Sequence, residues 1–560
     1  MLSRPFLPVL FAWLLPLGLC AQAPSGAAAA RPFSTAVYIP VMTVRHLADP
    51  AVLEAEWRRI SSQVRVDRVF IEAERSRVLA DDATLERVKA FFLARGVRVA
   101  GGITFSDGEQ DGQFRSFCYT DPADRAFVRR ASELVARHFD EVILDDFFFV
   151  TTKYDSDIAA KGGRSWTQFR LDLMDEAGRN LVVGAMKGVN PRVRVTIKYP
   201  NWYEHFQGLG FDLAQGPGIF DGIYTGTETR DPNSTDQYLQ QYESYKIVRY
   251  FENIAPGRNG GGWVDTFDLR YVDRYAEQLW DTALAKAREV TLFSWTGLLA
   301  PVHPGERAAW SGQATDFNFD RMLRYHPSEA AADPLPATMA RVAGYALEQV
   351  AGVVGRLGRP IGIASYRPPH GLGEDFLHNY FGMIGIPVDL RPDFPDQAPV
   401  VLLTEDAKAD PDLVGRIQRR LRAGGTVVIT SGLARALQGK GLEQIVELQF
   451  SGRRILADGY STGAGAGGRV LLPNATTGSP PALYPQVGFL TNDAWARVSA
   501  MSDGVGYPLL LEDRYGNHGR LYVWTIPDDF HNLYALPPTV IGAVKDVLME
   551  GFPVRMDGPS

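Results

Sequence analysis

The sequence predicts an α/β protein in which a (β/α)8 barrel, the TIM-barrel architecture, is followed by a smaller α/β domain. Three observations carry this prediction. From residue 33 onward, short β-branched runs alternate with amphipathic stretches, as parallel strands alternate with crossover helices. Eight such runs fall within roughly 300 residues, which suits a closed barrel better than an open sheet. The first run, Val37-Tyr38-Ile39-Pro40-Val41, is not followed by the glycine fingerprint of dinucleotide-binding sheets.

The strand candidates are rich in Val, Ile, Tyr, Phe and Thr, and each ends at a polar or glycine-rich break. They lie at residues 36–41, 68–73, 97–105, 141–149, 192–199, 220–227, 261–266 and 289–295. Helices are expected between them at residues 81–95, 122–138, 166–187, 235–251 and 271–287. Capping residues agree with these limits, because Asp121-Pro122 combines an N-cap with a proline at the first helical position, and Gly96 follows the helix that starts at Asp81.

The composition changes at residues 331–336, where proline and alanine precede a new helix. We therefore place the barrel at residues 33–330 and a second α/β domain at residues 338–560. The expected elements of the second domain are helices at 340–357, 411–423 and 538–549, strands at 361–365, 400–403 and 426–430, and a β-rich stretch at 446–524.

The first 23 residues have the pattern of a secretion signal. A positive charge precedes an apolar run from Phe6 to Leu19, and Ala21-Gln22-Ala23 offers a small-x-small cleavage site. We therefore expect residues 1–23 to be a cleaved signal peptide and the mature protein to be secreted or periplasmic. A lipoprotein anchored through Cys20 is less favoured, because Leu19 is bulkier than the residue that usually precedes a lipidated cysteine.

Composition and charge exclude several classes of partner. The formal net charge is −7 and no basic cluster occurs, so nucleic acid is not an expected partner. No later stretch reaches the roughly 20 apolar residues of a membrane span. After cleavage Cys118 would be alone, which rules out an intramolecular disulfide. The 9 histidines are scattered, and Ile158-Ala159-Ala160 breaks the calcium-ligand spacing that Asp155-Ser156-Asp157 begins, so we expect no metal and no cofactor.

Aromatic and polar side chains gather at the predicted carboxyl ends of the strands, where the βα loops of a barrel form the active site. Tryptophans there can stack on the apolar faces of sugars, although a single tryptophan is more often part of the core. Glu72 and Glu74, two residues apart, are expected to share a face and to be alternative members of a catalytic pair. The expected substrate-binding residues are Glu72, Glu74, Lys198, Trp202, Tyr224, Trp263, Asp265 and Trp295.

Two adjacent carboxylates, Asp145 and Asp146, stand within the apolar run from Val142 to Phe149. Strand alternation would direct one of them into the barrel and the other between neighbouring strands or into the loop. Burying either charge costs several kcal/mol unless it is paired or protonated, which favours a functional role. The competing interpretation is an aspartate that caps the next loop. The sequence leaves open which of the two faces the cleft.

Cleavage of a glycosidic bond uses two carboxyl groups, one to protonate the leaving oxygen and one to act as nucleophile or to activate water. Glu228 is the preferred partner of the aspartate pair, because strands four and six lie two apart around a barrel, and Asp231 and Asp265 are the next candidates. An ion pair between Glu228 and a neighbouring arginine, or a helix cap in a solvated loop, is the alternative. The expected catalytic residues are therefore Asp145, Asp146, Glu228 and Asp231.

The layout resembles that of the family 42 β-galactosidases, in which a barrel is followed by a glutamine-amidotransferase-like, flavodoxin-like domain. The segment from Gly519 to Pro527, followed by a final helix, is similar to the end of such domains. Glutaminase chemistry needs a cysteine nucleophile after a central strand, whereas residues 426–430 lead to Ser431-Gly432. The resemblance implies a non-catalytic domain. It also leaves open a homo-oligomer formed through that domain, which supports trimers in family 42.

Family 42 enzymes carry Asn-Glu at strand four, whereas this chain has Asp145-Asp146, so that family's catalytic assignment does not transfer. An aspartate there is more similar to the α-galactosidase-like clan, whose nucleophile is an aspartate at strand four and whose acid/base is an aspartate at strand six. This resemblance implies that Asp145 is the nucleophile and that Asp231 competes with Glu228. The individual family stays unassigned.

Together these features predict a secreted glycosidase that cleaves a carbohydrate substrate, an oligo- or polysaccharide. Two alternatives use the same barrel. One is a non-catalytic saccharide-binding scaffold. The other is a polysaccharide lyase, which would use Lys198 or a tyrosine as its base.

Overall fold

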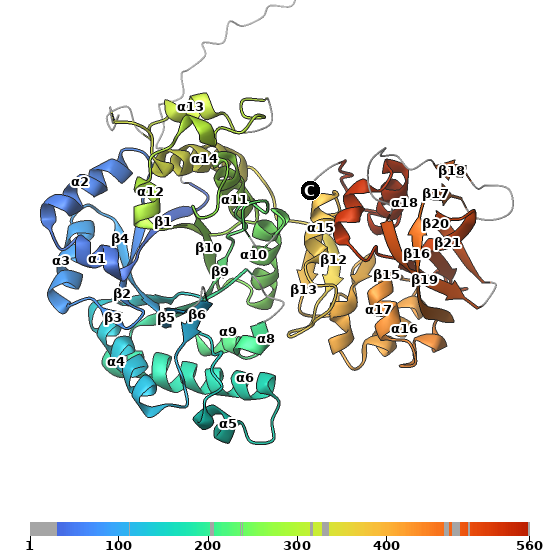
Figure 1. Ribbon diagram of the computed structural model, residues 1–560, viewed down its shortest axis with the longest axis horizontal. Helices are drawn as coiled ribbons and strands as arrows, with labels where there is room; N and C mark the ends of the chain where they lie inside the picture. Colours follow the sequence, from blue (N-terminus) through green and yellow to red (C-terminus); the bar gives the residue numbers. More distant parts are fainter. Residues whose placement is uncertain are drawn as a thin grey trace, which may run out of the picture.

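Figure 1 shows the computed structural model of the chain, in which a barrel and a C-terminal region built on a second sheet lie side by side. The structure describes residues 31–110, 113–201, 206–235, 237, 239–313, 317–327, 335–463, 470–472, 482–490 and 493–557. The predicted signal peptide and Trp202 lie outside the described residues, as does most of the Pro- and Ala-rich stretch. No helix among the described residues is long and apolar enough to cross a membrane.

Eight parallel strands close into a barrel, which confirms the predicted fold class. The closing contact is made by β1, which pairs with β2 on one side and with β11 on the other. The strands in order around the barrel are β1 (Ser34–Ile39), β2 (Arg68–Arg75), β4 (Arg98–Thr104), β7 (Glu141–Leu144), β8 (Arg194–Tyr199), β9 (Gly222–Gly226), β10 (Asn259–Asp265) and β11 (Glu289–Phe293).

Helices cover the outside of the barrel, close to the predicted positions (Figure 1). The Asp121 side chain caps α4 as expected from the sequence, by accepting hydrogen bonds from backbone N–H groups of the first turn. Asp81, which we expected to be the first residue of its helix, caps α3 in the same way. The main helices are α2 (Pro50–Ser61), α3 (Asp82–Leu93), α4 (Pro122–His138), α6 (Trp166–Ala177), α10 (Tyr242–Ile254) and α11 (Val272–Leu284).

The inside of the barrel is filled by side chains from most of its strands. Tyr38, Phe70, Tyr224 and Trp263 form one buried cluster, in which the rings of Tyr38 and Trp263 lie 4.7 Å apart. Gly102 makes room for it, because a Cβ at that position would lie 2.6 Å from the Tyr38 hydroxyl. This layer separates the two ends of the barrel, so any site at the carboxyl ends has a closed floor.

Two strands end earlier than the sequence predicts in a way that changes where predicted site residues lie. The strand β7 stops at Leu144, so Asp145 and Asp146 belong to the loop that follows rather than to the strand. The strand β11 stops at Phe293, and Trp295 becomes the first residue of α12 (Trp295–Leu299). In both cases the apolar run continues past the last ladder partner, and composition alone does not reveal where pairing ends.

The C-terminal region is a nine-stranded mixed sheet with a separate hairpin. Its parallel half is formed by β13 (Val388–Arg391), β12 (Ile363–Tyr366), β14 (Val400–Leu403), β15 (Thr426–Thr430) and β22 (Arg520–Trp524). Its antiparallel half is formed by β21 (Val505–Arg514), β20 (Ala494–Ser502), β17 (Gly459–Thr462) and β18 (Val470–Leu472), and the hairpin by β16 (Leu448–Ala457) and β19 (Ala482–Phe489). The helices are α15 (Leu377–Met383), α16 (Leu413–Arg422), α17 (Ser431–Ala436) and α18 (Pro538–Leu548).

One helix of the barrel, α10, forms much of the contact with the C-terminal region, where it lies against α15 and β13 (Figure 1). The Tyr250 hydroxyl donates to the Arg367 carbonyl at 3.2 Å, and Asn253 Nδ2 donates to Asp389 Oδ1 at 2.8 Å. The helix that we expected to open the second domain, α14 (Met339–Val354), instead packs against the barrel helices α11 and α12.

Candidate active site

A cavity of about 630 Å³ opens at the carboxyl ends of the barrel strands. Of the predicted site residues, it is lined by Asp145, Asp146, Lys198, Glu228, Trp263 and Asp265. Its other lining residues are Arg75, Phe114, Phe147, Phe149, Thr151, Leu209, Arg230, Gln237, Phe267, Asp268 and Phe293.

Lys198, near the end of β8, is the centre of the charged network. Its Nζ lies 2.8 Å from Glu228 Oε1, 2.9 Å from Asp146 Oδ2 and 3.3 Å from Asp145 Oδ1. Burial opposes the charge of Lys198, but the carboxylates of Asp146, Glu228 and Asp145 outweigh burial and raise its pKa. The lysine therefore keeps its positive charge, and carboxylates that follow β7 and β9, the strands on either side of β8, converge on it.

The shared lysine limits the separation of Asp146 and Glu228. Because Nζ lies 2.9 Å from one carboxylate oxygen and 2.8 Å from the other, those two oxygens can be no more than about 5.7 Å apart. Retaining glycosidases place their two carboxyl groups about 5 Å apart, and inverting ones roughly 6.5–9.5 Å apart. This limit on one oxygen of each carboxylate is compatible with the retaining spacing.

Asp145 is surrounded by donors. Its Oδ2 accepts hydrogen bonds from Arg75 Nη2 at 3.0 Å and from the Thr104 hydroxyl at 3.2 Å, and its Oδ1 accepts one from the backbone N–H of Asp146 at 3.0 Å. Burial alone would raise its pKa, but the charges of Lys198 and Arg75 outweigh burial and hold the pKa below its usual range. Asp145 is therefore an ionised carboxylate whose lone pairs are largely occupied.

Asp146 and Glu228 have fewer donors and higher pKa values. Burial, together with the nearby Asp145 and Glu228 carboxylates, raises the pKa of Asp146 to about 7 against the opposing charge of Lys198. Burial also raises the pKa of Glu228, an effect that Lys198 opposes and Asp265 reinforces. Asp146 can therefore exchange a proton near neutral pH, which is the property of a general acid.

The residue that pairs with Arg230 is Asp265, not Glu228. Arg230 Nη2 donates to Asp265 Oδ2 at 2.8 Å, while Glu228 is held by Lys198. The arginine-pair interpretation of Glu228 is thus wrong in this structure. Burial raises the pKa of Asp265, and the Arg230 charge opposes that rise. Asp265 lines the cavity, but its carboxylate is paired with the Arg230 guanidinium.

Glu72 and Glu74 do not share a face. The register of β2 against β4 shifts between them, and this bulge cancels the alternation expected for residues two apart. Glu72 accepts hydrogen bonds from the Tyr38 hydroxyl at 2.7 Å and from Arg75 Nε at 3.0 Å. It therefore contacts Arg75, which lines the cavity, without lining the cavity itself. Glu74 accepts a hydrogen bond from the backbone N–H of Arg77 at 2.9 Å. Neither glutamate lines the cavity.

Three further predicted residues lie away from the cavity. Asp231 accepts a hydrogen bond from the backbone N–H of Asn233 at 3.0 Å, because the chain turns at Arg230, whose φ is 57°. Tyr224 points to the opposite end of the barrel, where its hydroxyl lies 2.7 Å from Thr291 Oγ1. Trp295 is buried in the outer layer. Its indole Nε1 donates to Glu56 Oε2 at 2.7 Å and its ring stacks on Trp57.

Several residues of the cavity were not among the predicted site residues. Arg75 and Arg230 follow predicted strands, so their positions in the sequence carried a signal. Phe114 and Phe267 lie beyond the predicted strands, on β6 (Gln113–Ser116) and in the loop after β10, and nothing in the sequence distinguished them from other surface aromatics. Within the described residues, no group of three or more His, Cys, Asp or Glu side chains is arranged to hold a metal ion.

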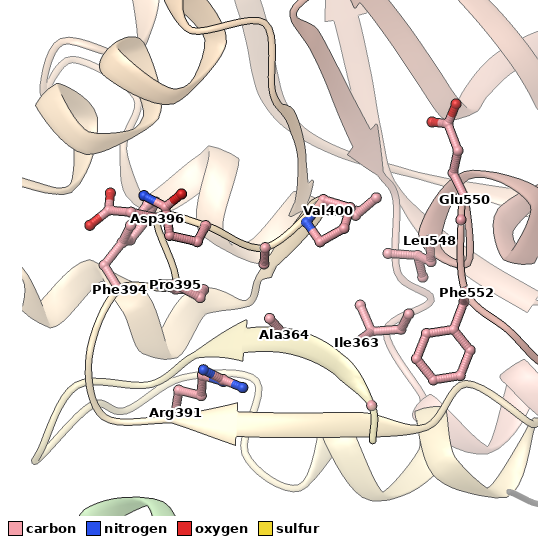
Figure 2. A pocket seen from close by; sticks show the side chains of 15 residues that line it. Ile363, Ala364, Arg391, Phe394, Pro395, Asp396, Val400, Leu548, Glu550 and Phe552 are labelled. Atoms are coloured by element: carbon pink, nitrogen blue, oxygen red, sulfur yellow. The ribbon is translucent and has the colours of Figure 1, made fainter. Parts of the chain in front are cut away.

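A second hollow of about 600 Å³ lies in the C-terminal region (Figure 2). Its apolar side chains include Ile363, Val400 and Phe552, and its carboxylates, Asp396 and Glu550, lie at opposite ends on different segments (Figure 2). Both carboxylates are exposed, and Glu550 accepts a hydrogen bond from Arg520 at 3.1 Å. This hollow has no buried cation joining a pair of carboxylates.

The chain matches the family model described as "Probable glycosyl hydrolase, catalytic domain" over residues 22–356. A second model, described as "Uncharacterized protein SSO3021, second domain", matches residues 358–464. The chain is 28% identical to the uncharacterized protein SSO3021 of Saccharolobus solfataricus over 302 residues, which are 48% of this chain and 50% of that protein. The matched part thus spans half the length of this relative.

Three solved structures share the fold over most of the chain. A β-galactosidase from Rahnella sp. R3 has a TM-score of 0.61 and 12% identity, covering 93% of this chain and 89% of that one. α-L-Fucosidase isoenzyme 2 from Paenibacillus thiaminolyticus has a TM-score of 0.61 and 13% identity, covering 93% and 84%. Gan42B, a GH42 β-galactosidase from G. stearothermophilus, has a TM-score of 0.57 and 12% identity, covering 94% and 89%. The predicted layout, a barrel followed by a second domain, is that of these glycosidases.

Proposed function

The chain belongs to the family of probable glycosyl hydrolase catalytic domains, and from this premise we propose that it hydrolyses an oligo- or polysaccharide with Asp146 as general acid and Glu228 as nucleophile. The observation that carries the proposal is the buried Lys198, which joins carboxylates from two non-neighbouring strands within one cavity. A lone buried carboxylate would be a structural oddity. Two buried carboxylates in one sugar-sized cavity are the catalytic groups that cleavage of a glycosidic bond requires.

In the first step, the protonated Asp146 carboxyl gives its proton to the glycosidic oxygen while a Glu228 oxygen attacks the anomeric carbon. The bond from that carbon to the leaving oxygen breaks, and an ester joins the sugar to Glu228. In the second step, the Asp146 carboxylate takes a proton from water as the water oxygen attacks the same carbon. Glu228 is released as a carboxylate, Asp146 is protonated again, and the product keeps its anomeric configuration.

The other charged residues of the cavity set the charge and position of Asp146 and Glu228. Lys198 favours the ionised form of Glu228, which a nucleophile requires. Asp145 holds Lys198 and Arg75 in place, and its occupied lone pairs make it a poor nucleophile. This assignment differs from the α-galactosidase-like expectation, in which Asp145 would attack.

The same contacts argue against the two alternatives. A lyase would need Lys198 as a neutral base, but the surrounding carboxylates keep it protonated. A lyase also has to neutralise a uronate carboxylate, whereas Arg75 and Arg230 already pair with Asp145 and Asp265. A non-catalytic scaffold has no use for a buried carboxyl group whose pKa is about 7.

The test uses alanine variants of both carboxylates on a panel of p-nitrophenyl and disaccharide glycosides. We expect Asp146→Ala to lower kcat/KM about 100- to 10,000-fold on substrates with poor leaving groups. Azide should restore the activity of Asp146→Ala and give a glycosyl azide of retained configuration. It should restore the activity of Glu228→Ala and give a glycosyl azide of inverted configuration. Nuclear magnetic resonance identifies both products. Full activity in both variants contradicts the proposal, and inversion by the wild-type enzyme contradicts the role of Glu228.

The predicted signal peptide leads to a second part of the proposal, that the enzyme is exported and acts outside the cytoplasm. Expression of the full chain in a Gram-negative host should give a periplasmic product whose amino terminus, read by mass spectrometry, starts after Ala23. A cytoplasmic product that keeps all 23 residues contradicts export.

We also propose that the C-terminal region is a non-catalytic, amidotransferase-like support through which copies of the chain can assemble. Ser431, at the position of an amidotransferase nucleophile, is buried, and its hydroxyl accepts a hydrogen bond from the backbone N–H of Ile526 at 3.0 Å. It is therefore not available for attack on a substrate. Light scattering of the purified chain measures the assembly, and a monomer at all concentrations contradicts it.

A further inference from the structure

Two columns of aromatic rings line the catalytic cavity. In the first, Phe147 lies between Phe149 and Phe114, with ring centroids 6.1 and 4.7 Å from its own. The rings of the first column come from the loop after β7 and from the strand β6.

In the second column, Phe293 stacks on Trp263 at 5.6 Å and contacts Phe267 at 6.1 Å. The Arg75 guanidinium lies 5.7 Å from the ring centroids of both Phe147 and Phe293, and so spans the two columns.

Exposure rises along both columns. Trp263 is 1% exposed and Phe149 is 7% exposed, whereas Phe114 and Phe267, which end the columns, are 54% and 51% exposed. A single exposed aromatic residue needs no explanation. Two of them, each ending a column that lines the same cavity, form an apolar entrance of the kind that marks a ligand site.

The arrangement also separates the two parts of a substrate. The carboxylates and Lys198 lie at the buried end, above the closed floor of the barrel. A sugar attacked there occupies the deep end, and its leaving group must project toward the entrance. The flat faces of a second ring would then meet the exposed rings of Phe114 and Phe267.

We propose that Phe114 and Phe267 form the leaving-group subsite and make the enzyme selective for glycosides whose leaving group is itself a ring, such as a second sugar or an aryl group. The inference rests on the proposed function, since it takes the deep end of the cavity as the place of bond cleavage. It adds two specificity-determining residues that take no part in proton transfer.

The experiment compares matched pairs of substrates, the p-nitrophenyl and methyl glycosides of the same sugar, for Phe114→Ala and Phe267→Ala. Phe489→Ala is the control, because Phe489 is 38% exposed on β19 of the C-terminal region. We expect each entrance variant to lose about tenfold in kcat/KM on the p-nitrophenyl glycoside, mainly through KM, and less than about twofold on the methyl glycoside. The control should change neither value.

A binding measurement gives the same answer independently of turnover. The Trp263 side chain lies in the cavity, so tryptophan fluorescence can follow the binding of phenyl and methyl glycosides to Glu228→Gln. A preference for the phenyl glycoside that disappears in the entrance variants supports the subsite. Equal losses on both glycosides, no loss on either, or the same loss in Phe489→Ala overturns it. If instead Asp146 and Glu228 variants keep full activity, the proposed function fails, and the binding preference still decides the role of the two phenylalanines.

Discussion

Two hollows of similar volume, about 630 Å³ at the end of the barrel and about 600 Å³ in the C-terminal region, differ in where their charges lie. In the barrel, the Lys198 side chain is 3% exposed and touches three carboxylates. In the C-terminal region, Arg391, Asp396 and Glu550 are exposed to solvent. Volume therefore does not distinguish the candidate active site from the other hollow. Buried ionisable groups do distinguish it, because such groups destabilise a fold unless they are paired, and they are therefore concentrated at functional sites.

The largest expected effect comes from removing the charge at the centre of the barrel cavity. Lys198→Met leaves the Asp146 and Glu228 carboxylates buried without their cation, and we expect the free energy of unfolding at pH 7 to fall by about 3–5 kcal/mol. Burial raises the pKa of both carboxyl groups, so they bind more protons in the folded than in the unfolded state. The deficit should therefore shrink as the pH falls toward 4.

Urea unfolding at several pH values measures this effect, and Arg391→Met in the other hollow is the matched control. Because Arg391 is exposed, its loss should change stability by less than about 0.5 kcal/mol. An equal loss of unfolding free energy in Lys198→Met and Arg391→Met would contradict the inference that only the barrel cavity holds buried, paired charges.

The next effect is on the pH dependence of catalysis. In the proposed mechanism Asp146 must be protonated to act, and its pKa is about 7, so kcat/KM should fall about tenfold per pH unit above that value. A dinitrophenyl glycoside, whose leaving group needs no proton, should lack this alkaline limb. Asp396→Asn, in the C-terminal hollow, should leave the whole profile unchanged. An alkaline limb that persists with the dinitrophenyl substrate would assign the pKa to another group.

The smallest effect is expected in the C-terminal hollow itself. Phe552 is half-buried there, and Phe552→Ala removes packing without touching a charged network. We expect a loss of about 1 kcal/mol in unfolding free energy and no change in kcat/KM. Thermal unfolding and steady-state rates check the two parts. A large fall in kcat/KM would mean that the C-terminal hollow takes part in catalysis.

The sequence could predict most of the barrel and the centre of the candidate site, because closure of a barrel brings all strand ends together whatever the loops do. Asp145, Asp146, Lys198 and Glu228 converge for that reason. The position of Trp295 outside the cavity was not predictable, since it depends on the residue at which the pairing of β11 with its neighbours stops. Likewise, the partner of Glu228 depends on side-chain direction in the loop after β9.

Single-residue irregularities account for two other errors. A one-residue bulge in β2 separates Glu72 from Glu74, and a left-handed turn at Arg230 directs Asp231 away from the cavity. Neither position carries the glycine that usually signals such a conformation. The entrance phenylalanines follow no strand-end rule, because Phe114 lies on the strand β6, outside the barrel sheet.

The loop that carries Glu228 continues directly into α10, the helix that lies against α15 and β13. Nearby, the Tyr534 hydroxyl donates to Gln240 Oε1 at 2.7 Å, so a residue of the C-terminal region holds the segment between Glu228 and α10. A chain truncated before Tyr534 would thus keep the proposed proton-transfer residues, and we expect it to lose activity because the segment after Glu228 loses this contact. The segment that follows Glu228 is thus held by both halves of the chain.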